Sequence, residues 1–203
     1  MNTTNRIIQA SPPHTGSYLL LNLIHGFFLP DEPQRWCSER LIDDYFITKT
    51  HRLNINELIE KYPQYNMYFV MSERDDNKVS RLICESDRLN KNVLIINYNE
   101  FVESDVLSLH TIIDNIFDKF IKFFPPDMIP DKNHTEIKNN MTTRIENMNI
   151  CVDKLKNEPF SIFDSFYGIH GNHRHRDVNH ANYVFVSGKD TRDISWPAKV
   201  ESV

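Results

Sequence analysis

The stretch Arg6-Ile-Ile-Gln-Ala-Ser-Pro-Pro-His-Thr-Gly-Ser17 decides the fold, because it leads a β-prone run through a short loop into a helix. The run ends at Ala10, and two prolines and Gly16 then force a turn. Over residues 17–28 the apolar side chains recur at helical spacing along one face. A strand that turns directly into a helix predicts the first unit of an α/β sheet.

The alternation of β-prone and helical segments continues through the first half of the chain. It predicts further strands at 44–49, 67–71 and 93–96, and further helices at 54–62 and 77–89. Such an alternation indicates a parallel β-sheet of four to five strands flanked by helices, with right-handed crossovers. We therefore expect an α/β fold that binds its ligands at the carboxyl ends of the strands.

The second half of the chain reads as helices followed by an irregular tail. A long helix is predicted over 104–124, where two prolines stop it. The polar segment 127–140 is predicted to be a loop, and Thr143-Arg-Ile-Glu146 a capping box that begins another helix. From Glu158 onward no secondary-structure period is visible.

The size and composition of the chain limit the architecture and the partners. With 203 residues, 40% hydrophobic and 25% charged, we expect one globular domain over 1–203. The α/β core is expected at 1–124, and a helix plus an irregular C-terminal segment at 141–203. The net charge of −5 argues against nucleic-acid and membrane-surface partners. The longest apolar stretch, 18–29, is too short and interrupted to span a bilayer.

The cysteines and the N-terminus bear on the compartment. Cys37, Cys84 and Cys151 are far apart and fit no disulfide or metal spacing, which is typical of reduced thiols. Residues 1–6 are polar and lack the apolar core of a secretory signal. Together these features predict a cytoplasmic protein.

The loop between Ser11 and Ser17 has the features of a phosphate-binding turn. Gly16 permits close backbone approach, and the start of the following helix attracts an anion through its N–H groups and dipole. Thr15 and Ser17 add hydroxyl donors. The alternative is an ordinary turn with a Ser N-cap. The Walker pattern Gly-x-x-x-x-Gly-Lys-Ser/Thr is absent, so an ordinary ATPase or GTPase is disfavoured.

Two further strand ends carry groups suited to catalysis or phosphate binding. Lys49 and His51 follow the second strand two residues apart, where an imidazole can act as a general base and an ammonium can neutralise a leaving group. Arg74 and Ser80 follow the third strand and are candidate phosphate ligands. The alternatives are a solvated strand end and an exposed charged loop.

These segments, in this order, resemble the sulfotransferase family that uses 3'-phosphoadenosine-5'-phosphosulfate (PAPS). Pro13-His-Thr-Gly-Ser-Tyr-Leu19 falls on the family's first loop, Pro-Lys-Ser-Gly-Thr-Thr-Trp. Lys49-Thr-His51 matches the Lys-Thr-His of the cytosolic branch. Asp76 and Ser80 align with the 3'-phosphate motif Arg-Asn-Pro-x-Asp-x-x-x-Ser, and Tyr98-Asn-Glu-Phe101 is similar to the family's Tyr-Glu-Asp-Leu.

The resemblance covers roughly residues 6–124 and implies a P-loop NTPase-like sulfotransferase fold. It implies that His51 is the catalytic base, while Lys49 and His14 stabilise the charge that builds during transfer. The implied nucleotide contacts come from the first loop, the segment after the third strand and a C-terminal Gly-containing segment: Pro13, His14, Thr15, Gly16, Ser17, Tyr18, Arg74, Ser80, Gly171 and Arg174.

Three departures from the family pattern qualify these implications. His14 replaces the loop Lys and would act only when protonated. The Arg of the 3'-phosphate motif falls on Ser72, with Arg74 two residues later. The family's C-terminal Arg-Lys-Gly loop is missing in that form, and the segment 167–174 is expected to take its place.

The implied reaction moves a sulfuryl group from PAPS to a hydroxyl or amine of a small-molecule or carbohydrate acceptor. The nucleotide product is adenosine 3',5'-bisphosphate, and no metal is required. Two alternatives remain open, namely a weakly active or inactive nucleotide-binding or interaction protein of this fold, and a small-molecule kinase. His170, His173 and His175 match no common zinc spacing, so no metal site is predicted.

Overall fold

The computed structural model describes residues 4–11, 16–34, 42–50, 54–73, 90–102, 107–158 and 162–170. Its elements, in chain order, are β1 (Thr4–Ala10), α1 (Ser17–Phe28), β2 (Ile47–Thr50), α2 (Ile55–Lys61), β3 (Tyr65–Glu73), β4 (Val93–Asn97), the 3-10 turn η3 (Tyr98–Glu100), α4 (Leu109–Phe123), α5 (His134–Leu155), β5 (Phe163–Asp164) and β6 (Ile169–His170).

The main sheet has four strands in the order β2-β1-β3-β4, and all of its pairs are parallel. Gln9 of β1 is in register with Lys49 of β2 and with Val70 of β3. The expected parallel α/β sheet is therefore confirmed. The predicted helix at 77–89 lies outside the described residues.

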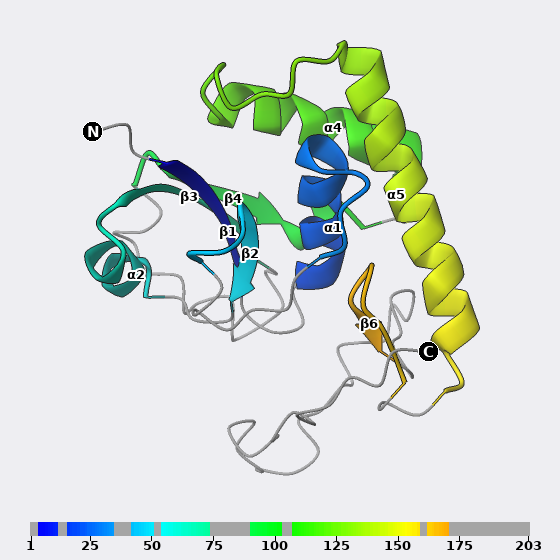
Figure 1. Ribbon diagram of the computed structural model, residues 1–203. Helices are drawn as coiled ribbons and strands as arrows, with labels where there is room; N and C mark the ends of the chain where they lie inside the picture. Colours follow the sequence, from blue (N-terminus) through cyan, green and yellow to red (C-terminus); the bar gives the residue numbers. More distant parts are fainter. Residues whose placement is uncertain are drawn as a thin grey trace.

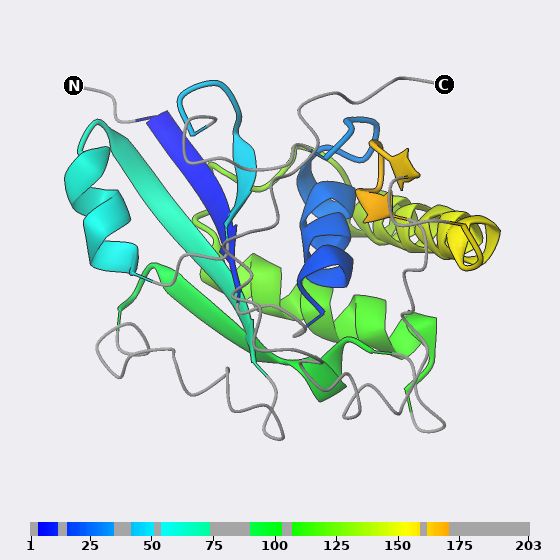
Figure 2. The same ribbon diagram turned by 90° about the horizontal axis from the view of Figure 1, so that it is seen from below.

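Helices cover both faces of this sheet (Figures 1 and 2). Residues alternate along each strand, so Ile7 belongs to the core beneath α1, α4 and α5, whereas Ile8 belongs to the core beneath α2. In the larger core, Phe27 of α1 packs edge-on against Phe120 of α4, with ring centroids 5.3 Å apart. Phe117 and Phe120 of α4 are thus core residues.

The second strand begins at Ile47, three residues later than the sequence predicted. Asp43 and Asp44 lie in a turn instead. The Arg6 guanidinium holds this turn beside β1 by donating to the carbonyl oxygens of Ile42 (2.8 Å) and Asp43 (3.1 Å). The hydroxyl of Tyr65 donates to Asp43 Oδ1 at 2.8 Å. The backbone at Asp43 is therefore tied to side chains, and the contact with β1 begins at Phe46, whose carbonyl oxygen accepts from Ile7 N–H at 2.8 Å.

The long helix of the second half begins at Leu109, so the predicted start at 104 is wrong by about one and a half turns. Ser108 is its N-cap, and its hydroxyl accepts from the backbone N–H of Thr111 at 3.3 Å. Serine is a favoured cap because its oxygen satisfies one of the N–H groups that the first turn leaves open. The helix ends at Phe123, before the two prolines that were expected to stop it.

A single helix, α5, spans His134–Leu155. The loop predicted at 127–140 is confirmed only over 127–133, since α5 takes its second half and runs through the capping box predicted at Thr143. The cap is Asn133, whose Oδ1 accepts from Glu136 N at 2.8 Å. Its first turns are polar on the exposed side, but Ile137 and Met141 are fully buried one turn apart. Within the described ranges, no helix has the length and apolar character needed to cross a membrane.

A short antiparallel hairpin, β5–β6, follows α5 and was not predicted from the sequence. Arg144 of α5 ties it to the rest of the fold: Nη2 donates to the Phe166 carbonyl, Nη1 to the carbonyls of Pro30 and Glu32, and Nε to Asn22 Oδ1. Burial of this guanidinium lowers its pKa to about 10, so it remains charged at neutral pH. One buried cation thus joins α1, α5 and the hairpin.

Candidate functional site

The strand order reverses at the β1–β3 pair, since the chain leaves β1 for β2 on one side and returns to β3 on the other. In doubly wound sheets, ligands bind outside the carboxyl ends of the strands at such a reversal. Ser11, directly after β1, and Ser72 of β3 meet here. The backbone N–H and the hydroxyl of Ser72 both donate to Ser11 Oγ, at 2.8 Å and 2.9 Å. This edge is the candidate site.

Gly16 brings the N-terminus of α1 to the same edge. It is the N-cap of α1 and has left-handed dihedral angles of φ 72° and ψ 22°. A Cβ at this position would lie 2.7 Å from Cε2 of Phe101 and 3.0 Å from Cδ2 of Tyr98. The left-handed dihedral angles require glycine, and so do the rings of Tyr98 and Phe101, which form an aromatic wall beside it. The cap supplies no side-chain hydrogen bond to the first turn, whose N–H groups and positive dipole end attract anions.

The aromatic wall against Gly16 is held by the turn at the end of β4. Asn97 caps this turn, and its backbone N–H donates to Glu100 Oε1 at 3.0 Å in a capping box. Glu100 also pairs with Lys119 of α4, with 2.9 Å between Oε2 and Nζ. Tyr98 and Phe101 are in edge-on contact, with ring centroids 5.8 Å apart. The turn after β4 therefore fixes how closely the start of α1 can approach the ends of the strands.

Lys49 places a cation beside the first turn of α1. It is the next-to-last residue of β2 and is only 3% exposed. Its Nζ lies 3.2 Å from the centroid of the Tyr18 ring, a cation–π contact. Burial raises the pKa of the Tyr18 phenol, so this ring stays neutral at physiological pH. The amine of Lys49 and the start of α1 therefore lie on the same face of the sheet.

Of the predicted site residues, the structure describes Gly16, Ser17, Tyr18 and Lys49, and it places them at the carboxyl edge of the sheet and the start of α1. The remaining predicted residues lie outside the described residues: Pro13, His14, Thr15, His51, Arg74, Ser80, Gly171 and Arg174. Their roles remain predictions.

Four residues of this edge were missed by the sequence analysis as site residues, namely Gln9, Ser11, Ser72 and Phe101. Gln9 had a visible signal, because it is a polar residue in an otherwise apolar strand, and it is fully buried. The pairing of Ser11 with Ser72 depends on the register between β1 and β3, which no short motif encodes. The contact of Phe101 with Gly16 joins residues that are far apart in sequence.

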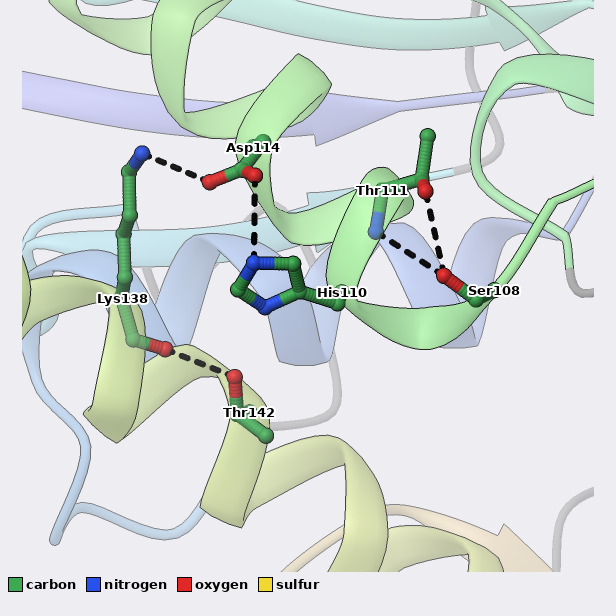
Figure 3. A network of polar contacts seen from close by, with 6 residues as sticks. All are labelled: Ser108, His110, Thr111, Asp114, Lys138 and Thr142. Atoms are coloured by element: carbon green, nitrogen blue, oxygen red, sulfur yellow. Dashed lines mark hydrogen bonds and ion pairs between the residues drawn. The ribbon is translucent and has the colours of Figure 1, made fainter.

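A second polar network lies on the outer surface of α4 and α5 (Figure 3). Lys138 Nζ donates to Asp114 Oδ1 at 2.6 Å, and His110 Nε2 lies 3.5 Å from Asp114 Oδ2. The hydrogen bond from Lys138 lowers the pKa of the Asp114 carboxyl. The His110 side chain is 87% exposed, and solvent-exposed pairs of this kind contribute little to stability or to binding. Among the described residues, no group of three His, Cys, Asp or Glu side chains is arranged to hold a metal ion.

Comparisons of the chain with protein-family models, curated proteins and solved structures give no significant match.

Proposed function

We propose that this protein binds PAPS at the carboxyl edge of its sheet and transfers the sulfuryl group to a hydroxyl or amine of a small-molecule or carbohydrate acceptor. The observation that carries this proposal is the position of Gly16. It directs the open N-terminus of α1 toward the β1–β3 reversal, on the face of the sheet where Lys49 also lies. An open helix N-terminus beside a cation suits a phosphate or sulfate group.

In this mechanism the backbone N–H groups at the start of α1 bind the 5'-phosphate. The acceptor oxygen or nitrogen attacks sulfur and loses its proton to His51, while the bond from sulfur to the bridging phosphate oxygen breaks. Lys49 neutralises the charge that grows on that bridging oxygen. Adenosine 3',5'-bisphosphate leaves. As in phosphoryl transfer, the rate comes mainly from positioning and charge stabilisation.

The other assigned residues serve the nucleotide. Arg74 and Ser80 bind the 3'-phosphate, and His14, when protonated, assists Lys49. Gly171 and Arg174 belong to a segment that covers the bound nucleotide. The remaining loop contacts are made by Pro13, Thr15, Gly16, Ser17 and Tyr18.

A second candidate is a nucleotide-binding protein of the same fold that transfers nothing. The burial of Lys49 beneath the Tyr18 ring favours it, because an ammonium covered by an aromatic side chain must move before it can reach a leaving group. Both candidates predict binding of the bisphosphate, and only the first predicts turnover.

The test is calorimetric titration with adenosine 3',5'-bisphosphate, with ATP and Mg²⁺ as the control, followed by sulfuryl-transfer assays. We expect micromolar binding of the bisphosphate, little binding of ATP, and loss of turnover but not of binding in His51→Ala. His110→Ala, an exposed histidine on α4, is the matched control and should keep both properties. Absence of binding at millimolar bisphosphate from about pH 5.5 to 8, the range in which a histidine changes charge, would overturn the proposal.

A further inference from the structure

Gln9 is a buried polar residue whose side chain is only half satisfied. It is 0% exposed, and its Nε2 donates to Ser11 Oγ. In the described part of the structure, its Oε1 has no hydrogen-bond partner. Burial of an amide atom without a hydrogen-bond partner destabilises the folded state, so a polar side chain in this place requires a reason.

The amide end of Gln9 lies at the candidate site. Because it contacts Ser11, two residues further along the chain, the side chain extends toward the carboxyl end of β1. Lys49 is directly opposite Gln9 in the β1–β2 register, and side chains in register on parallel strands share a face of the sheet. That face is the one on which Lys49 meets Tyr18 of α1. The unpartnered end of Gln9 is therefore on the α1 side of the sheet, near the start of the helix.

The hydrogen bonds around Ser11 indicate which end of the amide a ligand would meet. Ser11 Oγ accepts from Ser72 N and from Ser72 Oγ, and two donors fill the lone pairs of a hydroxyl oxygen. A third donor, Gln9 Nε2, competes for the same oxygen. Rotation of the Gln9 amide by half a turn puts Oε1 next to the Ser11 hydroxyl. This rotation leaves the NH₂ group as the open end.

We propose that Gln9 is a binding residue for a tetrahedral oxyanion, a phosphate or sulfate group, to which its amide NH₂ donates from the floor of the site. This inference rests on the proposed function, since it adds a ligand contact to the same edge. Three different groups then meet the anion: the first turn of α1, the Lys49 ammonium and the Gln9 amide. The Gln9 contact is neutral, so it keeps its strength across the pH range in which histidines titrate.

The test uses Gln9→Met, which keeps the length of the side chain and removes its polar atoms. Loss of a half-satisfied buried amide should leave the melting temperature unchanged or raised, while the affinity for adenosine 3',5'-bisphosphate falls by about tenfold, the effect of one hydrogen bond to a charged group. Thr48→Val is the matched control. Thr48 is also buried on β2 with an unpartnered Oγ1, but it is in register with Ile8, whose side chain lies in the core beneath α2. Removing the Thr48 hydroxyl should leave both the melting temperature and the affinity for the bisphosphate unchanged.

The outcomes separate this inference from the proposal on which it rests. If wild-type protein binds the bisphosphate and Gln9→Met binds it equally well, Gln9 is no ligand and only this inference fails. If Gln9→Met loses stability and affinity together, the amide serves to support Ser11, and the inference also fails. If the wild-type protein binds no bisphosphate, both fail. Weaker binding in a variant of undiminished stability, with Thr48→Val unchanged, supports the ligand role.

Discussion

At the scale of single residues, Gly16 makes the most specific structural prediction. Substitution Gly16→Ala puts a Cβ 2.7 Å from a ring carbon of Phe101 and forces alanine into a left-handed conformation. We expect a loss of about 1–3 kcal/mol in the free energy of unfolding, from backbone strain and overpacking together. Urea denaturation of the two proteins measures the difference.

A double-mutant cycle separates the two causes of this loss. Phe101→Leu removes the obstructing ring carbon, so Gly16→Ala should be less harmful in that background, by about 1 kcal/mol. The strain of the left-handed backbone stays in both backgrounds. Equal costs in the two backgrounds would show that Phe101 does not constrain Gly16.

Individual residues also show how much of the candidate site could be predicted from the sequence. The turn before α1 was predicted because Gly16 and two prolines form a local pattern, and Lys49 was named as a candidate because it ends a β-prone run. Gln9 was overlooked, although a polar residue in a buried strand is a local signal. The hydroxyl pair of Ser11 and Ser72 could not be found, because it depends on strand register, and register is set by the packing of the whole sheet.

At the scale of elements, the contact between α1 and α5 depends on Gly26. A Cβ there would lie 2.7 Å from the Cα of Met141, which is a backbone atom that no rotamer change can move. Gly26→Ala should therefore destabilise the fold by about 1–3 kcal/mol, although alanine is the better helix former by about 1 kcal/mol. Thermal and urea denaturation will show the sign of the change.

Two controls define the cause of that destabilisation. Met141→Ala shortens the side chain but leaves the Cα in place, so it should not rescue Gly26→Ala. Asn139→Ala, at an exposed position of α5, should raise stability slightly through helix propensity alone. A stabilised Gly26→Ala protein would contradict the close packing of the two helices.

The elements that the sequence predicted best are those with a strong apolar period. The helix at 17–28 was predicted at its observed bounds, because its apolar face and its flanking loop agree. The start of α5 was missed, since its first turns are mostly polar and only Ile137 and Met141 mark the buried side. The strands β5 and β6 have two residues each, which is too short for any period to be visible. Arg144 of α5 and Asn22 of α1 bind the hairpin to the helices by donating to the carbonyl oxygens of Phe166 and Tyr167, and no short motif encodes these contacts.

At the scale of the whole molecule, the two faces of the sheet differ in what they carry. The face under α2 holds a small apolar core and the buried hydroxyl of Thr48, whereas the opposite face combines the larger core with a group of buried polar side chains at its carboxyl edge. Gln9, Ser11, Lys49 and Ser72 are polar and all buried at this edge. A protein that needed only to fold would place apolar residues there. This asymmetry is the main physical reason for proposing a functional site at that edge.

The same face makes the stability of the molecule dependent on pH through His25 of α1. Burial, aided by the charge of Arg144, lowers the pKa of this imidazole to about 3, whereas an unfolded chain has a histidine pKa of about 6.5. Between these values the unfolded state binds a proton that the folded state does not. The free energy of unfolding therefore falls as the pH decreases from about 6.5, by about 1.4 kcal/mol per pH unit from this residue.

His25→Leu replaces the imidazole with an apolar side chain that has no charge at any pH. We expect its free energy of unfolding to decrease less steeply between about pH 6 and pH 4 than that of the wild-type protein, by about one proton per molecule. At about pH 7.5 both side chains are neutral, so the difference there reports packing alone and serves as the reference. Urea denaturation at a series of pH values gives both quantities. Parallel pH profiles for the two proteins would mean that His25 takes up a proton in the folded state, and that the core around α1 admits charge that its burial should exclude.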